Sequence, residues 1–243
     1  GVVGAEVARQ VVYHGDELRM AAGIPIEVVA VSARDRLVDR GVNLDGIDWY
    51  EEATKLAERD DIDIIVEMIG GSKGVALDLA RAALKSGKHL ITANKAMIAH
   101  HGAELAQLAE THGVHILFES AVAGGIPAVK TLREGLAGNK ITRVAGILNG
   151  TCNYILSTME TTGRNFEEVL ADAQRLGYAE DEPSFDVDGI DAAHKLTILA
   201  AIAYGHKPDF KAVSIQGIRD VSSVDFTYAN QLGFRIKLVG VAE

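Results

Sequence analysis

The sequence has little of what would mark several classes of protein. Its 243 residues include one cysteine, Cys152, so the chain can form no internal disulfide, and we expect a reducing, cytoplasmic setting. No apolar run approaches the about 20 residues that a membrane span requires, and no signal peptide is visible. Lys and Arg number 24 against 34 Asp and Glu, and the resulting net charge of -10 disfavours a nucleic-acid-binding protein.

Short apolar runs alternate with helical patterns in the first part of the chain, which is 48% hydrophobic overall and therefore globular. The apolar runs predict buried parallel strands at 26–31, 62–69, 88–92 and 114–118. The patterns between them predict helices from residue 5 onward and at 51–59, 74–86 and 99–112. This alternation is typical of an α/β fold, namely a Rossmann-type doubly wound parallel sheet.

The alternation stops near residue 140. We therefore predict a first domain at 1–139 and a second domain of α+β character at 140–243. Strands of the second domain are predicted at 141–148, 212–218 and 234–241. Its helices are predicted at 154–160, 166–176 and 190–204.

The opening stretch predicts a dinucleotide site in the first domain. Gly1-Val2-Val3-Gly4 fits the end of a G-x-G-x-x-G turn, because a helical pattern and then a strand follow it. In that turn the backbone approaches a pyrophosphate, which the helix N-terminus stabilises. Gly70 and Thr92 end or follow two predicted strands at the ligand-binding edge of such a sheet, and we assign them to the same site. Two glycines three residues apart also occur by chance at helix starts, so this alternative stays open.

The segment after the strand at 26–31 bears on the choice of dinucleotide. An adenosine ribose with a free 2′-hydroxyl is usually held by an acidic residue at this point. Here Arg34 can face a 2′-phosphate, with Ser32 as a donor, which favours NADP over NAD. In the alternative, Arg34 is a solvated loop residue and Asp35 binds the ribose of NAD; use of both cofactors is also open.

An acidic cluster precedes one lysine at the start of the helix predicted at 190–204. Asp188 stands where an N-cap is expected, with Asp191 three residues later. Helical spacing places Asp191 and Lys195 on one face as an ion pair. Alone, such a pair is typical of a capped amphipathic helix and contributes about 0.3–0.5 kcal/mol. The neighbouring carboxylates, including Glu180 and Asp186, favour a functional site instead.

Several separated motifs resemble the homoserine dehydrogenase family. They are Thr92-Ala93-Asn94-Lys95, the run FESAVAGGIP at 118–127, the run GILNGTCNY at 146–154, the run LGYAE at 176–180 and the opening stretch. The resemblance covers essentially every residue present. It implies an NAD(P)-dependent interconversion of the small-molecule substrates L-aspartate 4-semialdehyde and L-homoserine, in the biosynthesis of threonine and methionine.

The resemblance also implies roles for individual residues. Lys195 would donate and accept the proton, Lys95 would lie near the nicotinamide and the substrate, and Asp191 would orient Lys195. A cationic acid beside the carbonyl oxygen stabilises the developing alkoxide and supplies its proton, so the chemistry agrees with these roles. The residues implied to bind the amino-acid aldehyde are Thr151, Glu180, Asp186 and Lys195.

The glycine-rich run at 118–127 is implied to hold a monovalent cation such as Na⁺. The ligands carried over from the family are Glu119, Val122, Gly124 and Ile126. Hard cations prefer oxygen ligands, and an irregular loop exposes backbone carbonyls that can supply them. In the alternative interpretation the run is a glycine-rich turn without an ion.

Two other functions compete with this interpretation. A cysteine-dependent aldehyde dehydrogenase would use Cys152 as nucleophile, but no histidine lies near it in the sequence and a buried packing role is favoured. A non-catalytic nucleotide sensor would keep the glycines and lose the catalytic side chains. Lys95, Asp191 and Lys195 are all present, which argues against a sensor.

The start and the end of the sequence lead to a further expectation. The sequence starts at Gly1 without an initiator methionine, and the first strand and first glycine of the fingerprint are absent. We expect a partial chain that also lacks the C-terminal part of the second domain. The resemblance further implies a homodimer or homotetramer, in which the strands predicted at 141–148, 212–218 and 234–241 pair across a two-fold axis or within one chain.

Overall fold

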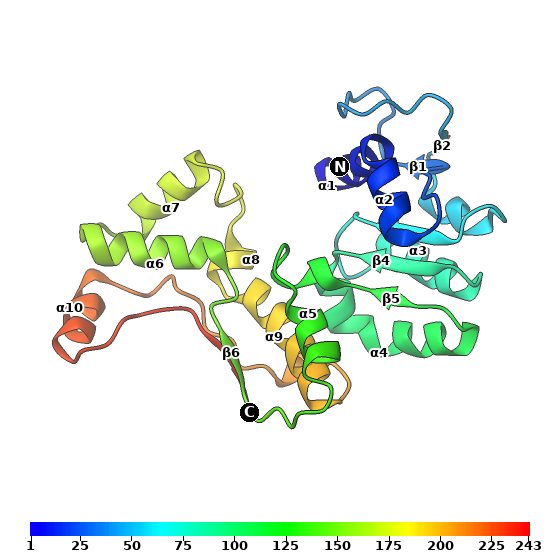
Figure 1. Ribbon diagram of the computed structural model, residues 1–243. Coiled ribbons are helices and arrows are strands. Elements are labelled where there is room, and N and C mark those ends of the chain that lie inside the picture. Colours follow the sequence, from blue (N-terminus) through cyan, green and yellow to red (C-terminus); the bar gives the residue numbers. More distant parts are fainter. The chain divides into compact units, whose positions relative to one another are not determined.

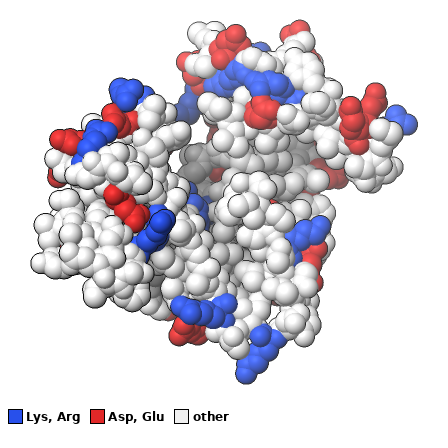
Figure 2. Space-filling view, turned by 60° about the vertical axis from the view of Figure 1, so that its left-hand side comes forward, with Lys and Arg blue, Asp and Glu red and all other residues white.

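A computed structural model describes residues 1–243, which form two compact units (Figure 1). We call Gly1–Gly124 the N-terminal unit and Gly125–Glu243 the C-terminal unit. The structure has no helix whose length and apolar content would let it span a bilayer. On the face shown in Figure 2, acidic and basic side chains lie in small mixed groups between broad uncharged areas.

The N-terminal unit alternates helices and strands, as predicted. Its helices are α1 (Val2–Tyr13), α2 (Gly15–Ala22), α3 (Val75–Lys85) and α4 (Lys95–His112), with 3₁₀ turns η1 (Ala53–Glu58) and η2 (Glu119–Ala121). Its strands are β1 (Ala30–Ser32), β2 (Asp48–Tyr50), β3 (Ile64–Glu67), β4 (His89–Thr92) and β5 (Ile116–Leu117). β1 pairs with β2, and β3, β4 and β5 form a second ladder; all of these pairings are parallel. The predicted α/β class with a parallel sheet is therefore confirmed.

Apolar residues at helical spacing decide how α3 and α4 pack. Leu77, Ala80 and Leu84 of α3 are buried, as is Leu105 of α4, and α3 contacts α4, β3 and β4. Leu90 in the middle of β4 has no exposed area. Burying each of these large side chains contributes about 1.5–3 kcal/mol, so this layer fixes the strands whose ends carry the predicted site residues.

The C-terminal unit is mainly helical. Its elements are α5 (Ala128–Lys130), a π-helical turn η3 (Thr131–Gly135), β6 (Val144–Gly146), α6 (Gly150–Thr162), α7 (Phe166–Arg175), α8 (Ser184–Val187), α9 (Ile190–Tyr204), a 3₁₀ turn η4 (Phe210–Ala212), α10 (Ser223–Gln231) and β7 (Gly240–Ala242). β6 and β7 pair antiparallel within the chain, with Ala145 opposite Val241. The core of this unit gathers apolar side chains of α6 and α7 around Ile155, Leu156 and Val169.

The N-terminal unit ends at Gly124 and the C-terminal unit begins at Gly125, whereas the sequence predicts the boundary at 139–140. The difference is the segment 125–139. Its turns α5 and η3 contact each other, and η3 contacts α9 of the C-terminal unit. The break in the strand–helix alternation therefore comes later in the sequence than the break in packing.

Some predicted elements differ from those observed. The strand predicted at 212–218 was wrong: the 3₁₀ turn η4 ends at Ala212, and the residues after it are irregular. Ile218 N–H donates to the Val187 carbonyl at 2.8 Å, so this segment bonds to the end of a helix rather than to a strand. In place of the strands predicted at 26–31, 141–148 and 234–241, the structure has the shorter strands β1, β6 and β7, and β1 and β7 end one residue later than predicted. Ladder bonds form only where a partner strand runs alongside.

Helix ends also differ from the sequence pattern. Helices α4 and α6 begin four residues before the predicted starts, because the amides of Asn94 and Asn149 cap them. The predicted N-cap of α9 was wrong: Gly189, at φ 83°, precedes the helix, and no side chain caps it. Asp188 instead pairs with Arg219, with its Oδ1 2.5 Å from the Arg219 Nε. Helices α2, α8 and α10 and strand β2 were not predicted.

Candidate active site

The side chain of Lys195 is held by two oxygen atoms of the C-terminal unit. Its ammonium nitrogen lies 2.8 Å from the Asp191 Oδ2, one helical turn earlier on α9, and 2.7 Å from the Leu148 carbonyl oxygen. The Asp191 side chain is 3% exposed and that of Lys195 is 19% exposed. The ion pair predicted from helical spacing is thus present. Its burial distinguishes it from the exposed pairs that contribute little.

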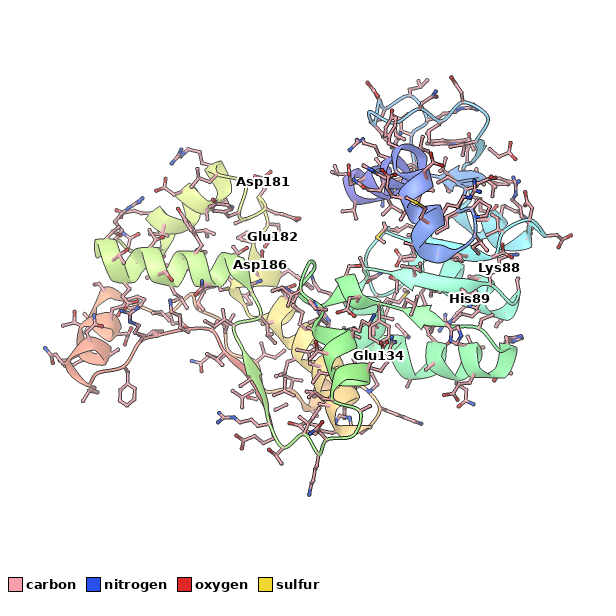
Figure 3. All side chains as sticks on the ribbon, in the orientation of Figure 1. Lys88, His89, Glu134, Asp181, Glu182 and Asp186 are labelled. Carbon is pink, nitrogen blue, oxygen red and sulfur yellow. The ribbon has the colours of Figure 1, made fainter.

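A buried amide joins this pair to a second carboxylate. Asn149, which directly precedes α6, donates from its Nδ2 to the Asp186 Oδ1 and to the Asp191 Oδ2, both at 2.7 Å. Asp186 lies on α8, the short helix between α7 and α9, where Figure 3 labels it together with Asp181 and Glu182. Three elements therefore bring Asp186, Asp191 and Lys195 together.

The other two residues predicted to bind the substrate, Thr151 and Glu180, also belong to the C-terminal unit and lie at or beside the loop between α7 and α8. The Thr151 hydroxyl, in the first turn of α6, donates to the Tyr178 carbonyl oxygen at 2.7 Å. Glu180 is exposed, and its backbone carbonyl accepts a hydrogen bond of 3.0 Å from the Gln174 amide. These contacts place Thr151 against the loop that carries Glu180.

Cys152 is buried beside Asn149 and Asp186. Its backbone N–H donates to the Asn149 Oδ1 at 2.7 Å, and its thiol contacts the Asp186 carbonyl oxygen at 3.2 Å. Burial, with smaller contributions from Asp186, Asp191 and Asp188, raises the pKa of the thiol to about 12. A cysteine nucleophile needs a lowered pKa, so this environment disfavours the thioester alternative.

In the N-terminal unit, the carboxyl ends of β3 and β4 are joined by a buried carboxylate. Glu67 is 1% exposed, and its Oε1 accepts from Ile69 N–H at 2.6 Å and from Gly70 N–H at 3.1 Å. Its Oε2 accepts from the Thr92 hydroxyl at 2.6 Å. The same hydroxyl oxygen accepts from Asn94 N–H at 2.9 Å.

Lys95 is the first residue of α4, next to the capping residue Asn94. The Asn94 Oδ1 accepts from Met97 N–H at 3.0 Å, and its Nδ2 donates to the Gly71 carbonyl oxygen at 2.7 Å. The predicted residues Gly70, Thr92 and Lys95 therefore belong to one hydrogen-bonded edge of the sheet. Gly70, at φ 86°, takes a backbone conformation that side chains disfavour.

The opening glycines lie at the start of α1. Gly1 is its N-cap residue, and neither a side-chain cap nor an acidic residue occupies the first turn. Gly4 packs near the end of β3, where an added Cβ would stand 3.8 Å from the Met68 Cβ. Arg34 follows β1 and is exposed, while the Asp35 Oδ1 accepts from Leu37 N–H at 2.8 Å.

The segment predicted to hold a cation is irregular. It begins with the turn η2 at Glu119, Val122 is fully buried, and Ala123 has a positive φ of 51°. Ile126 is 64% exposed. No group of three or more His, Cys, Asp or Glu side chains in the structure is arranged to hold a metal ion, so any ligands here would be mainly backbone carbonyls.

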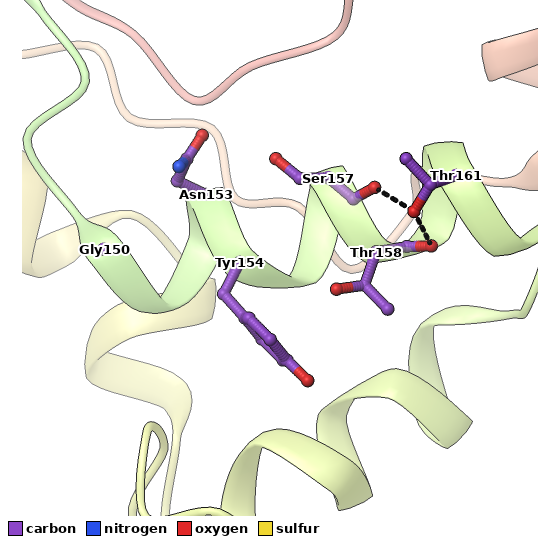
Figure 4. Close-up of a pocket in the computed structure, with 6 residues that line it drawn as sticks. All are labelled: Gly150, Asn153, Tyr154, Ser157, Thr158 and Thr161. Atoms are coloured by element: carbon purple, nitrogen blue, oxygen red, sulfur yellow. Dashed lines mark hydrogen bonds between the residues drawn. The ribbon is translucent and has the colours of Figure 1, made fainter.

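A shallow hollow also runs along α6 and contains none of the predicted residues (Figure 4). It is lined by Gly150, Asn153, Tyr154, Ser157, Thr158 and Thr161. The Thr161 hydroxyl donates to the carbonyl oxygens of Ser157 and Thr158, so that it satisfies backbone groups of its own helix.

Sequence reasoning missed two residues at the centre of these networks, Glu67 and Asn149. A glutamate at the end of an apolar strand was a usable signal, because a lone buried carboxylate requires hydrogen-bond donors. An asparagine before the glycine that opens α6 was also a usable signal, because asparagine is a preferred N-cap. The second donor role of Asn149 depends on α8 and α9 and has no local signal.

Comparison with known proteins gives one family for both units. The profile of "Homoserine dehydrogenase, NAD binding domain" matches residues 1–119, and the profile of "Homoserine dehydrogenase" matches residues 127–242. A homoserine dehydrogenase of Pseudomonas aeruginosa is 47% identical over 244 aligned positions, which cover 100% of this chain and 55% of that protein.

Solved structures agree. The crystal structure of a homoserine dehydrogenase from Thiobacillus denitrificans matches with a TM-score of 0.91 and 44% identity, over 100% of this chain and 56% of that one. A hyperthermophilic archaeal homoserine dehydrogenase in complex with NADPH matches with a TM-score of 0.70 and 28% identity, over 94% of this chain and 63% of that one. The chain thus spans about half the length of the curated relatives that it matches. With both units matched by profiles of one family and with relatives this similar, the chain belongs to the homoserine dehydrogenase family.

Proposed function

We propose that the chain forms the catalytic core of an NAD(P)-dependent homoserine dehydrogenase, which interconverts L-aspartate 4-semialdehyde and L-homoserine in threonine and methionine biosynthesis. The observation that carries the proposal is the Lys195 ammonium, held at 2.8 Å by the buried carboxylate of Asp191 in a chain of this family. In this proposal the N-terminal unit binds the cofactor. The C-terminal unit binds the amino-acid substrate and supplies dimer contacts.

The start of α1 supports a dinucleotide site. Its first-turn amides at Val2, Val3 and Gly4 have no side-chain cap, so they are suited to a pyrophosphate. Gly4 packs beside Met68, which brings this turn to the carboxyl end of β3. When bound, the nicotinamide cofactor supplies or accepts the hydride. Thr92 and Glu67 hold the neighbouring strand ends at a fixed spacing.

The same unit favours NADP. Arg34 is exposed directly after β1, where it can meet a 2′-phosphate, whereas Asp35 uses its Oδ1 to close a turn onto Leu37 N–H. The NADPH complex of the archaeal relative supports this choice. We expect Arg34→Ala to raise the KM for NADPH about 10-fold or more and to leave the KM for NADH within about twofold, since only NADPH carries the extra phosphate. Arg36→Ala is the matched control.

Lys195 performs the proton transfer in this proposal. An ammonium group has three donor protons, and Asp191 and Leu148 accept two of them. The third proton is available for the carbonyl oxygen of the aldehyde, and it passes to that oxygen as negative charge develops on it. Asp191 fixes the direction of the ammonium group. Lys95, at the first turn of α4, lies at the cofactor edge and adds positive charge there.

The carboxylates bind the α-ammonium of the amino acid. Asp186 is half-buried and Glu180 is exposed, so both can approach a ligand from the same loop region. Thr151 donates its hydroxyl proton to Tyr178, so its oxygen remains an acceptor for that ammonium. Lys195 contacts the reacting end of the same substrate.

The irregular segment after η2 supports a monovalent cation, such as Na⁺, bound by Glu119, Val122, Gly124 and Ile126. Positive φ angles at Ala123 and Gly125 turn the backbone in a way that can expose several carbonyls. We expect activity to depend on Na⁺ when it is compared with choline at equal ionic strength. Equal rates in the two salts would contradict a cation site.

The assembly and location of the protein follow from the same proposal. We propose a homodimer or homotetramer, supported by the exposed side chains of Val239 and Val241 beside and within the short strand β7. The single cysteine fits a cytoplasmic protein. Light scattering on the intact gene product tests the assembly; a monomer would contradict it.

The decisive experiment follows NADPH oxidation with L-aspartate 4-semialdehyde, on the intact gene product and its Lys195→Ala variant. We expect turnover by the wild type and a loss of about 10²–10⁴-fold in kcat for the variant, with cofactor affinity retained. Lys140→Ala, which removes an exposed lysine of the same unit, is the control and should leave the rate unchanged. Cofactor binding without turnover by the wild type would contradict the proposal and indicate a nucleotide sensor.

A further inference from the structure

Asn149 occupies the centre of the group formed by α6, α8 and α9. It is 3% exposed, and its side chain makes three contacts of 2.7 Å. The oxygen accepts from Cys152 N–H, and the amide nitrogen donates to Asp186 and to Asp191. Its neighbour Leu148 accepts from the Lys195 ammonium. Two consecutive residues therefore contact Asp186, Asp191 and Lys195.

We propose that Asn149 is a positioning residue that couples substrate binding to proton transfer. This inference rests on the proposed function, in which Asp186 binds the substrate ammonium and Asp191 orients Lys195. Two carboxylates that share one donor nitrogen would otherwise repel each other, because both are negatively charged. The two N–H bonds of Asn149 offset that repulsion and fix the distance between the carboxylates. In this way the carboxylate that binds the substrate ammonium keeps a fixed position relative to the carboxylate that orients Lys195.

The capping role of Asn149 does not explain this geometry. An N-cap needs only a side-chain oxygen, and Asn, Asp, Ser and Thr all supply one. Only an amide also offers two N–H donors from the same short side chain. Aspartate at this position would place a third negative charge beside Asp186 and Asp191. Serine would keep the cap and leave both carboxylates without their shared donor.

A double comparison separates the two roles. Asn149→Ser in the intact gene product should keep the cap of α6 and lose both bridging bonds. Asn165 is the matched control, because it caps α7 through a hydrogen bond from Glu168 N–H at 2.9 Å and is not part of the acidic group. We expect Asn149→Ser to lower Tm more than Asn165→Ser, because it also leaves the buried Asp191 and the half-buried Asp186 without their shared donor. Only Asn149→Ser should lower kcat/KM, by about 10- to 100-fold, because hydrogen bonds to charged groups are lost.

Separate values of KM and kcat test whether Asn149 couples substrate binding to proton transfer. Asn149→Ser should raise the KM for L-homoserine and also lower kcat, because it releases both Asp186 and Asp191. Combined with Asp186→Asn, it should cost less in kcat/KM than the sum of the single changes, whereas Asn165→Ser combined with Asp186→Asn should be additive. These cycles test whether Asn149 acts through Asp186.

The outcomes distinguish this inference from the function on which it rests. A wild-type protein without turnover would remove both. An active wild type with unchanged kinetics in Asn149→Ser and a lowered Tm would reduce Asn149 to an ordinary helix cap. If Asn149→Ser fails to fold, Asn149→Asp, which also keeps the capping oxygen, supplies the same comparison. Normal kcat and KM in that variant would overturn the proposal, since a third carboxylate would then be tolerated.

Discussion

The Asp191 carboxylate and the Lys195 ammonium form an ion pair of 2.8 Å, four residues apart on α9, in which the carboxylate side chain is only 3% exposed. Asp191 accepts a second hydrogen bond, from the Asn149 amide at 2.7 Å. A carboxylate with this little exposure is costly to bury unless its partners are fixed. The pair is therefore more than the surface contact that its sequence spacing indicates, and it directs the Lys195 ammonium.

The first prediction concerns the role of Asp191 in orienting the Lys195 ammonium. Asp191→Asn is nearly isosteric and keeps an oxygen that can accept from Asn149, so we expect a folded protein. The variant loses the negative partner of Lys195, and kcat should fall by about 10- to 100-fold because a charge-assisted bond of about 1.5–3 kcal/mol is lost. Steady-state kinetics check this result. Asp188→Asn, which disturbs only the exposed pair with Arg219, is the control, and a wild-type rate in Asp191→Asn would refute the orienting role.

The sequence allowed the α/β class and the Asp191–Lys195 pair to be predicted, because both depend on local periodicity. The parallel strands β3 and β4 are short apolar runs with helices between them, and the pair depends only on helical spacing. The predicted ends of elements were less accurate. Asn94 and Asn149 extend α4 and α6 by capping them, and their side chains act through contacts that the apolar pattern does not contain.

What the sequence did not allow depends on partners far along the chain. Residues 212–218 have the composition of a strand, but Gly217 packs against Val187 and Asp188 and the segment has no partner strand. Asp188 was predicted as an N-cap, yet it pairs with Arg219, which lies 31 residues later. Glu67 and Thr92 are 25 residues apart and meet only because β3 and β4 are neighbours. Such contacts are set by tertiary packing, which no local pattern records.

The second prediction concerns Glu67. Glu67→Ala would leave the N–H groups of Ile69 and Gly70 and the Thr92 hydroxyl without their acceptor. The Thr92 hydroxyl is buried, and losing the acceptor of a buried group costs about 1–3 kcal/mol. We expect lower stability in urea unfolding and NADPH affinity weakened by about 10-fold or more. Glu67→Gln keeps one oxygen for the two N–H groups and should be intermediate. Glu104→Gln, at the exposed pair with Arg81, should bind NADPH normally; equal affinity in all variants would refute a cofactor role for this edge.

The third prediction concerns the contact between the 213–219 segment and the corner of α8 and α9. A Cβ at Gly217 would lie 2.5 Å from the Val187 carbonyl oxygen and 2.7 Å from the Asp188 Cα. Both neighbours are backbone atoms, so Gly217→Ala should lower the free energy of unfolding by about 1–3 kcal/mol. Gly138→Ala is the control, because nothing lies within 4 Å of its added Cβ, and it should change stability by less than about 0.5 kcal/mol. Equal stability of the two variants in urea unfolding would contradict the close approach.

The fourth prediction concerns acid sensitivity. Hydrogen bonds from Arg164 and then Arg175 lower the pKa of Asp172 in the folded state. A lowered folded pKa means that the pair stabilises the fold above the unfolded pKa, near about 4, and that this contribution is lost as the pH falls through the folded value. Arg164→Gln should therefore flatten the fall of stability between about pH 5 and pH 2. Urea midpoints across this range measure the slope, with Arg19→Gln as the control; an unchanged slope in Arg164→Gln would count against the pair.

The last prediction concerns Cys152 and decides between hydride transfer without a covalent intermediate and thioester chemistry. Its pKa is raised to about 12 from an ordinary value of 9.0, chiefly by burial. The thiolate fraction at pH 8 is then far smaller than in the unfolded chain, and the thiolate is the form that reacts. Iodoacetamide should modify the native protein very slowly and the denatured protein rapidly, as measured by mass spectrometry.

The activity of a Cys152 variant provides the second part of this test. Cys152→Ser keeps a small side chain with a donor that can reach the Asp186 carbonyl oxygen, which the thiol contacts at 3.2 Å, so we expect a folded protein. Its kcat should stay within about threefold of the wild type, because packing is altered and no reacting group is lost. Rapid modification of the native thiol, together with an inactive but folded Cys152→Ser variant, would mean that the nucleophile is Cys152. In that case the acid/base role of Lys195 would have to be abandoned, since a thioester route passes through the sulfur atom and not through an alkoxide that Lys195 protonates.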